Sequence, residues 1–174
     1  MASARGTLPW QPFESAAHLV AEPVRSAGAP EGAEVAEIDA ALADTAAFCE
    51  AYDVAPEVSA NCVIVAGSRA GETRYAAVMV LATDRADVNG VVRRHLGARR
   101  IGFAPREEAT GLTGMEFGGI TPIGLPADWP VLVDERVAAA GPVVIGAGVR
   151  GAKLLVDGSA LASLPNATVL ALTR

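Results

Sequence analysis

A chain of 174 residues, 51% of them hydrophobic and 20% charged, is long enough for one domain with a buried core and too apolar to be disordered. The net charge of −6 argues against broad binding to nucleic-acid phosphates, so DNA is not an expected partner, although a small local phosphate site is compatible with it. Two cysteines and two histidines, without CxxC or CxxH spacing, exclude a disulfide framework and disfavour a zinc site. We predict no metal and no cofactor.

The first eleven residues show no apolar segment typical of a signal peptide. We expect residues 1–11 to form a loose leader in front of a single domain over residues 12–174. The longest apolar runs, such as Ala76–Ala82, fall far short of the roughly 20 residues that span a bilayer. The sequence therefore predicts a cytoplasmic protein with no membrane partner, either a monomer or a homodimer.

In chain order, the first half of the domain is predicted to contain two helices and three strands. Apolar residues at three- and four-residue spacing indicate the first helix, and Asp44 is placed to cap the second. Two continuous apolar runs indicate strands that form a hairpin around the polar loop Gly67–Thr73. The predicted elements are helix 12–27, strand 34–38, helix 44–52, strand 60–66 and strand 75–83.

In the second half, Asp87 opens a helix that Gly97 closes, and Pro105 begins another with acidic residues in its first turn. Residues Asp134–Pro142 are predicted to be a turn between strands. The predicted elements are helix 87–97, strand 99–103, helix 105–113, strands 131–133, 143–145 and 153–156, helix 159–164 and strand 167–172. Together they predict an α+β fold in which roughly seven strands form a mixed, barrel-like sheet flanked by helices.

The segment from Gly118 to Pro126 holds three glycines and two prolines in nine residues, which is typical of neither a helix nor a strand. Glycine permits positive φ and close backbone approach, while proline fixes φ and removes a donor. A rigid bent loop with several unpaired N–H groups follows from this composition. The alternative is a structural turn without a ligand.

Six segments, taken in order, carry a resemblance to a known family. They are Ala55–Glu57, Cys62–Val65, Thr113–Gly114, Gly118–Pro126, Val131–Glu135 and Ile145–Gly151. With them, residues 12–172 resemble the YbaK/prolyl-tRNA-editing superfamily of aminoacyl-tRNA deacylases. The resemblance implies a mixed β-barrel with flanking helices. It also implies hydrolysis of the ester between a wrong amino acid and the 3′-terminal adenosine of a tRNA, with backbone N–H groups of the glycine loop donating to the aminoacyl carbonyl.

One position departs from the family pattern. The family usually has a lysine at the head of the first long strand, where this chain has Asn61, whose amide donates hydrogen bonds but carries no charge. The only lysine, Lys153, aligns with a variable family position after the second glycine-rich segment. We predict that Lys153 restores the missing positive charge from another strand. The alternative is a solvated lysine at a strand end.

The resemblance therefore assigns a set of site residues. The predicted catalytic residues are Gly118, Asn61 and Lys153, and the predicted substrate-binding residues are Gly119, Ile120, Thr121, Pro122, Gly146, Gly148 and Arg150. For Arg150 a surface salt bridge is the alternative. The arginines at 93, 94, 99 and 100 form a basic cluster that could touch RNA.

The function expected from this site is that of a freestanding trans-editing deacylase acting on a small amino acid. Its partners are the 3′ end of an aminoacyl-tRNA and, as a candidate, an aminoacyl-tRNA synthetase. Because of Asn61, the alternative is a noncatalytic module that binds an aminoacyl-nucleotide or a protein partner. A domain that interacts only with protein would have no pocket at the glycine loop.

Overall fold

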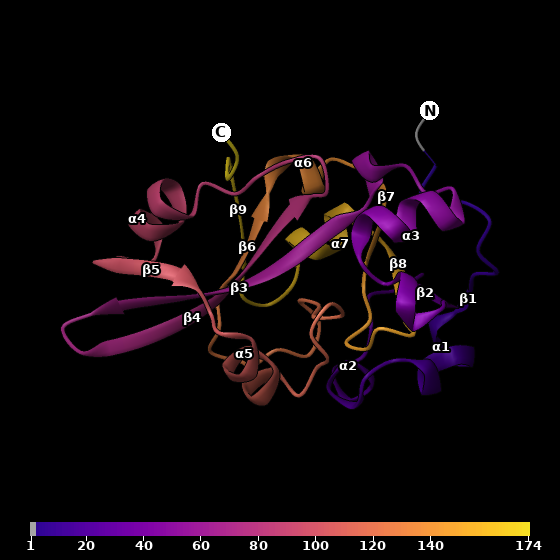
Figure 1. Ribbon diagram of the computed structural model, residues 1–174, viewed down its shortest axis with the longest axis horizontal. Helices are drawn as coiled ribbons and strands as arrows, with labels where there is room; N and C mark the ends of the chain where they lie inside the picture. Colours follow the sequence, from indigo (N-terminus) through magenta and orange to yellow (C-terminus); the bar gives the residue numbers. More distant parts are fainter. Residues whose placement is uncertain (1–2) are drawn as a thin grey trace.

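Two β-sheets form the scaffold of the computed structural model, which describes residues 3–174 (Figure 1). One sheet has the strand order β1-β2-β8-β7 and the other β5-β3-β4-β6-β9. The strands of the first are β1 (Gln11–Pro12), β2 (Glu34–Glu37), β7 (Pro142–Gly146) and β8 (Ala152–Asp157). Those of the second are β3 (Ala60–Arg69), β4 (Glu72–Leu81), β5 (Arg100–Phe103), β6 (Val131–Asp134) and β9 (Ala167–Leu170).

The α+β class is confirmed, but the single barrel-like sheet of roughly seven strands is wrong. Within residues 3–174 the strands form two separate sheets and no closed barrel. The two sheets approach each other at an isolated parallel bridge between Ser59 and Val144. A single bridge is too short a ladder to join the sheets, and β9 instead pairs with β6 at the edge of the second sheet.

The β3–β4 hairpin is the longest feature of the fold and projects from the body of the molecule in Figure 1. Its register runs without interruption from the Ala60–Leu81 pair to the Arg69–Glu72 pair. The turn is made by Ala70 and Gly71, both with positive φ, which matches the twist of a two-residue hairpin. The loop predicted over residues 67–73 is therefore mostly strand, because ladder pairing continues through its polar residues.

Seven α-helices lie around the sheets in the described residues (Figure 1). They are α1 (Phe13–Ala16), α2 (Glu22–Ala27), α3 (Thr45–Tyr52), α4 (Arg93–His95), α5 (Arg106–Thr113), α6 (Glu135–Ala138) and α7 (Gly158–Ala162). A π-helical turn, Val88–Val92, leads into α4. No helix within residues 3–174 has the length and apolarity needed to cross a membrane.

The helix predicted over residues 12–27 is interrupted. The 3₁₀ turn Ala17–Leu19 follows α1, and an extended link then leads into α2. Pro23 lacks the N–H that would bond one turn back, and its ring crowds that turn, so a continuous helix is excluded. The apolar spacing persists across the break because both pieces face the same core.

The turn predicted over Asp134–Pro142 contains α6. Asp134 is fully buried and fixes the start of this helix by accepting a 3.2 Å hydrogen bond from the Arg136 N–H. Its other oxygen accepts from the Leu172 N–H at 2.9 Å and so holds the C-terminal segment. A one-turn helix is too short to show apolar periodicity, which is why the pattern gave no signal for it.

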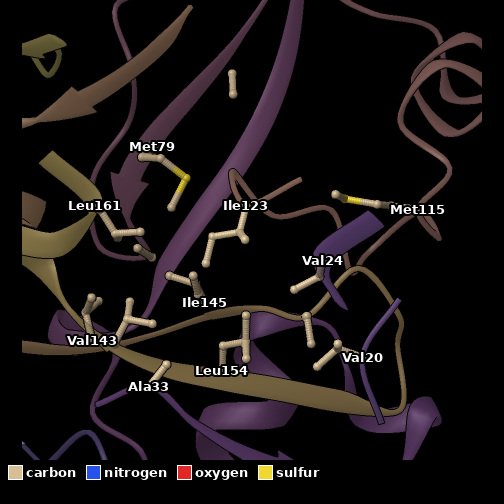
Figure 2. Close-up of a cluster of buried hydrophobic side chains, with 14 of the residues drawn as sticks. Val20, Val24, Ala33, Met79, Met115, Ile123, Val143, Ile145, Leu154 and Leu161 are labelled. Carbon is tan, nitrogen blue, oxygen red and sulfur yellow. The ribbon is translucent and has the colours of Figure 1, made fainter. Parts of the chain in front are cut away.

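The main core lies where α2, the glycine loop and both sheets meet (Figure 2). Figure 2 shows Val24, Ile123 and Ile145 converging in this core from three distant segments. A second cluster includes Ala4 and Leu8, which are buried with Phe48. The segment expected to be a loose leader thus packs against the domain over residues 3–10, while the first two residues of that prediction lie outside the described range.

Candidate functional site

A cleft of about 560 Å³ lies between α3, β3, α5 and the glycine loop. It is lined mainly by apolar side chains with a few polar groups, the usual character of a small-molecule site. The lining residues are Ala43–Thr45, Ala60–Ile64, Phe103, Ala104, Arg106, Ala109, Phe117, Gly118, Ile120, Gly146 and Lys153. The cleft therefore gathers Asn61, Lys153 and the head of the glycine loop.

The glycine loop makes a tight turn at the wall of the cleft. Gly118 has φ +87°, a conformation that glycine adopts without strain, and the Gly119 N–H donates to the Glu116 carbonyl at 3.0 Å. Among the described residues, the N–H groups of Gly118 and Ile120 donate to no other protein group. Both residues line the cleft, so their N–H groups are the candidate main-chain donors to a bound molecule.

The second glycine segment lies directly against this loop. The Gly148 N–H donates to the Gly119 carbonyl at 2.7 Å, and the Glu116 N–H donates to the Gly148 carbonyl at 2.9 Å. A Cβ on Gly146 would lie 2.6 Å from the Gly119 oxygen, closer than real Cβ contacts, so the two backbones touch. Only glycine fits such an approach, which fixes the loop on the end of β7.

Asn61 is half-buried near the start of β3. Its side-chain oxygen accepts a 2.8 Å hydrogen bond from the Thr45 hydroxyl at the start of α3. Since the amide oxygen is used in this way, the amide NH₂ is the donor that remains for a bound molecule. Thr45 was not singled out from the sequence, because no pattern links it to a strand sixteen residues later.

Lys153 lies on β8 and is only 8% exposed, so it is not the solvated strand-end lysine of the alternative interpretation. Its ammonium donates to the Ala43 carbonyl at 3.1 Å and lies 4.9 Å from the centre of the Phe48 ring. Burial lowers the pKa of Lys153, and the Arg150 charge acts in the same direction. No carboxylate forms an ion pair with Lys153 within the described residues, so it places a weakly compensated positive charge on the cleft.

Cys62 is the only cysteine among the residues that line the cleft, so it is the only candidate for a thiolate nucleophile there. Burial raises the pKa of its thiol to about 12. The thiolate is the nucleophilic form of cysteine, and at neutral pH this thiol is protonated. Cys62 is therefore a poor candidate for a nucleophile.

Arg150 braces the rim of the cleft. Its Nε donates to the Ala40 carbonyl at 3.2 Å, and its Nη1 lies 3.2 Å from a carboxylate oxygen of Asp44. The same Nη1 contacts the Phe117 carbonyl at 3.5 Å. The guanidinium thus ties the segment before α3 to the glycine loop, in line with the salt-bridge alternative.

Four other predicted substrate-binding residues do not line the cleft. Thr121, Pro122 and Gly148 are buried behind its wall, and Gly119 packs against Val149. Of these, Gly119 and Gly148 hold the loop through their mutual hydrogen bond, while the buried Thr121 hydroxyl has no partner among the described residues. The arginines at 93, 94, 99 and 100 also lie outside the cleft lining.

Three lining residues without a role in the sequence interpretation are Phe103, Arg106 and Phe117. They flank or begin α5, and the Arg106 guanidinium carbon lies 4.8 Å from the centre of the Phe117 ring. Phe117 could have been noticed, since it is a large apolar residue next to the glycine loop. Within residues 3–174, no group of three His, Cys, Asp or Glu side chains is placed to hold a metal ion.

Comparison with known proteins gives one family match. A family model described as an aminoacyl-tRNA editing domain matches residues 39–164, which include Asn61, the glycine loop and Lys153. No curated protein matches the chain significantly.

Solved structures share the fold. One, described as a "putative trans-editing enzyme for prolyl tRNA synthetase", is 22% identical with a TM-score of 0.70, covering 82% of this chain and 87% of the other. Another, the "hypothetical protein APE2540", is 22% identical with a TM-score of 0.68, covering 76% and 85%. At such identities the likeness concerns the fold.

Proposed function

The chain belongs to the aminoacyl-tRNA editing domain family, and from this premise we propose that it is a freestanding aminoacyl-tRNA deacylase. Residues 12–174 act as one editing domain that hydrolyses the ester of a small, wrongly attached amino acid on the 3′ end of a tRNA. The observation that carries this proposal is the pair of unpartnered N–H groups, Gly118 and Ile120, on a cleft that also holds Asn61 and Lys153.

In the proposed reaction the aminoacyl carbonyl oxygen accepts hydrogen bonds from the N–H groups of Gly118 and Ile120. Water adds to the carbonyl carbon, and the negative charge that develops on the oxygen is stabilised by these fixed donors. The bond to the ribose oxygen then breaks, and the proton lost by the water passes to that oxygen. The products are the free amino acid and a tRNA with a free terminal hydroxyl.

Asn61 and Lys153 supply orientation and charge. The Asn61 amide NH₂ donates to the substrate carbonyl or to the attacking water, while its oxygen stays bound to Thr45. The Lys153 ammonium adds positive charge in a site shielded from solvent, where electrostatic effects are strong. An ester needs little further activation, so positioning and electrostatics are sufficient and no nucleophilic side chain is required.

The lining of the cleft supports an uncharged, apolar acyl group. Ala60, Ala104 and Ala109 contribute short side chains, and Ile64 and Ile120 add apolar surface. We further propose a cytoplasmic location, an aminoacyl-tRNA synthetase as the source of the mischarged tRNA, and a monomeric or homodimeric state.

The test is a panel of tRNAs, each charged with one wrong amino acid, incubated with the purified protein. We expect loss of the ester above the uncatalysed rate for at least one small amino acid, and no loss from the correctly charged tRNAs. The Gly118→Ala variant serves as the inactive control. Stability of every ester in the panel at high protein concentration would exclude the deacylase.

A second candidate is a noncatalytic module that binds an aminoacyl-nucleotide or a protein partner, and Asn61 in place of the family lysine favours it. The deacylase hydrolyses the aminoacyl ester, whereas the noncatalytic module binds its ligand without hydrolysis. Binding of a nonhydrolysable aminoacyl-adenosine amide, together with stable esters in the tRNA panel, would support the module. Binding together with ester loss would support the enzyme.

A further inference from the structure

Two phenylalanines stand exposed at the cleft. The chain has four phenylalanines, two tyrosines and two tryptophans, and in the described residues only Phe103, 68% exposed, and Phe117, 48% exposed, are open to solvent. Both line the cleft, whereas the other exposed large hydrophobic residues, Leu112 and Val169, do not. Exposed apolar side chains that cluster at a cavity indicate a binding site.

Their positions follow from the fold. Phe103 is the last residue of β5, and Phe117 lies in the turn just after α5, so the helix between them holds both at the cleft. Arg106, the first residue of α5, also lines the cleft and places its guanidinium 4.8 Å from the centre of the Phe117 ring. This cation–π contact restrains the ring and adds a positive charge beside it.

We propose that Phe103, Phe117 and Arg106 form a platform that binds the terminal base of the tRNA 3′ end by stacking. The platform depends on the proposed editing function, because that function places the ribose ester at Gly118. The base is only a few covalent bonds from the ester, and Phe117 is the direct chain neighbour of Gly118. A substrate whose carbonyl contacts the glycine loop therefore brings its base to the two rings.

The chemistry of the three side chains suits an unpaired RNA base. Unstacked bases in RNA strands are held by aromatic rings and by guanidinium planes. Base–aromatic stacking tolerates any base, because every base has a π face. The net charge of −6 leaves little general attraction for RNA, so affinity must come from local contacts of this kind.

The experiment uses uncharged RNA, so its readout does not need hydrolysis. The probes are two fluorescently labelled minihelices, one ending in CCA and one in which the last nucleotide lacks its base. Dissociation constants are measured by anisotropy with the full-length protein. We expect the CCA probe to bind about tenfold more tightly than the abasic probe.

Single variants locate the effect. Phe117→Ala and Phe103→Ala should each reduce this base preference severalfold. Phe117→Trp should retain it, because an aromatic face is kept, while Phe117→Leu should lose it despite its apolar side chain. Leu112→Ala is the matched control, since Leu112 is 47% exposed on α5 but lies off the cleft. All three positions are exposed, so unchanged melting temperatures are expected.

Equal binding of the two probes by the wild-type protein would overturn the platform. A base preference that survives in both alanine variants would also overturn it. If the two alanine variants bound RNA as the wild-type protein does but no longer bound a synthetase, the rings would instead be a protein-docking surface. None of these results depends on ester hydrolysis, so the platform and the deacylase can fail separately.

Discussion

The Thr45 hydroxyl donates a 2.8 Å hydrogen bond to the side-chain oxygen of Asn61, joining the start of α3 to the start of β3 at the cleft. This contact uses the amide oxygen and leaves the NH₂ group of Asn61 outside the hydrogen bond. A lysine at position 61 would add a second positive charge to a cleft that already contains Lys153, and like charges disfavour each other. A neutral residue at position 61 therefore avoids the electrostatic repulsion that a second lysine would have with Lys153.

Substitutions at Asn61 separate the donor from the acceptor. Asn61→Asp keeps an oxygen for Thr45 but removes the NH₂ donor, so we expect it to lower kcat about 10²-fold with little change in melting temperature. Thr45→Val removes the partner and should lower kcat less, because the amide itself remains. Single-turnover deacylation measures both effects. Full activity of Asn61→Asp would show that the NH₂ group is not used.

Gly118→Ala tests the loop. The φ of +87° is strained for alanine, which disturbs the loop conformation, and the added methyl group would displace the Arg150 guanidinium. Displacement of one oxyanion donor should lower kcat by about 10²–10³. Gly141→Ala is the control, because Gly141 also has positive φ but its Cβ would meet open space away from the cleft. Similar losses of activity in both variants would argue against a role for the loop donors.

Lys153→Met separates activity from stability. The folded protein holds the Lys153 proton less tightly than the unfolded chain does, because burial lowers the pKa from 10.5. The charged form therefore destabilises the fold below the lowered pKa, and this effect fades as the pH rises toward 10.5. We expect Lys153→Met to raise the melting temperature at neutral pH by about 2–4 °C, with a smaller gain at high pH, while deacylation falls about 10²-fold.

Calorimetry between pH 6 and pH 10 measures the stability change, and Arg100→Met, at an exposed position on β5, is the control. A melting temperature that falls in Lys153→Met at every pH would mean that the ammonium stabilises the fold. Unchanged kinetics would remove Lys153 from the mechanism.

Cys62→Ala should leave kcat/KM within about threefold of the wild-type value. Burial raises the pKa of the thiol to about 12, so at pH 8 the protonated, weakly nucleophilic form dominates. Mass spectrometry after exposure to iodoacetamide at pH 8 should find Cys62 unmodified. Inactivation that follows alkylation of Cys62 would instead indicate a covalent mechanism.

Much of the fold could be predicted from local patterns. The β3–β4 hairpin followed from two continuous apolar runs and the start of α5 from Pro105, whereas Asp44 precedes α3 without making the predicted side-chain capping hydrogen bond. The break at Pro23 was missed because apolar spacing continues across a break in a helix. The helix α6 was missed because four residues are too few to show a helical period. Closure into a barrel was also predicted wrongly, because strand patterns do not say which edges pair.

For the cleft, the glycine positions and the segments that carry them can be identified from local sequence, because φ preference and apolar period are encoded within a few neighbouring residues. The contacts of those segments, in contrast, are set by how distant parts of the chain pack. The tertiary structure buried Lys153 beside a carbonyl 110 residues earlier in the chain, hydrogen-bonded Asn61 to Thr45, and left two phenylalanines exposed at the cleft. These outcomes depend on packing between distant elements, which no local pattern of residues records.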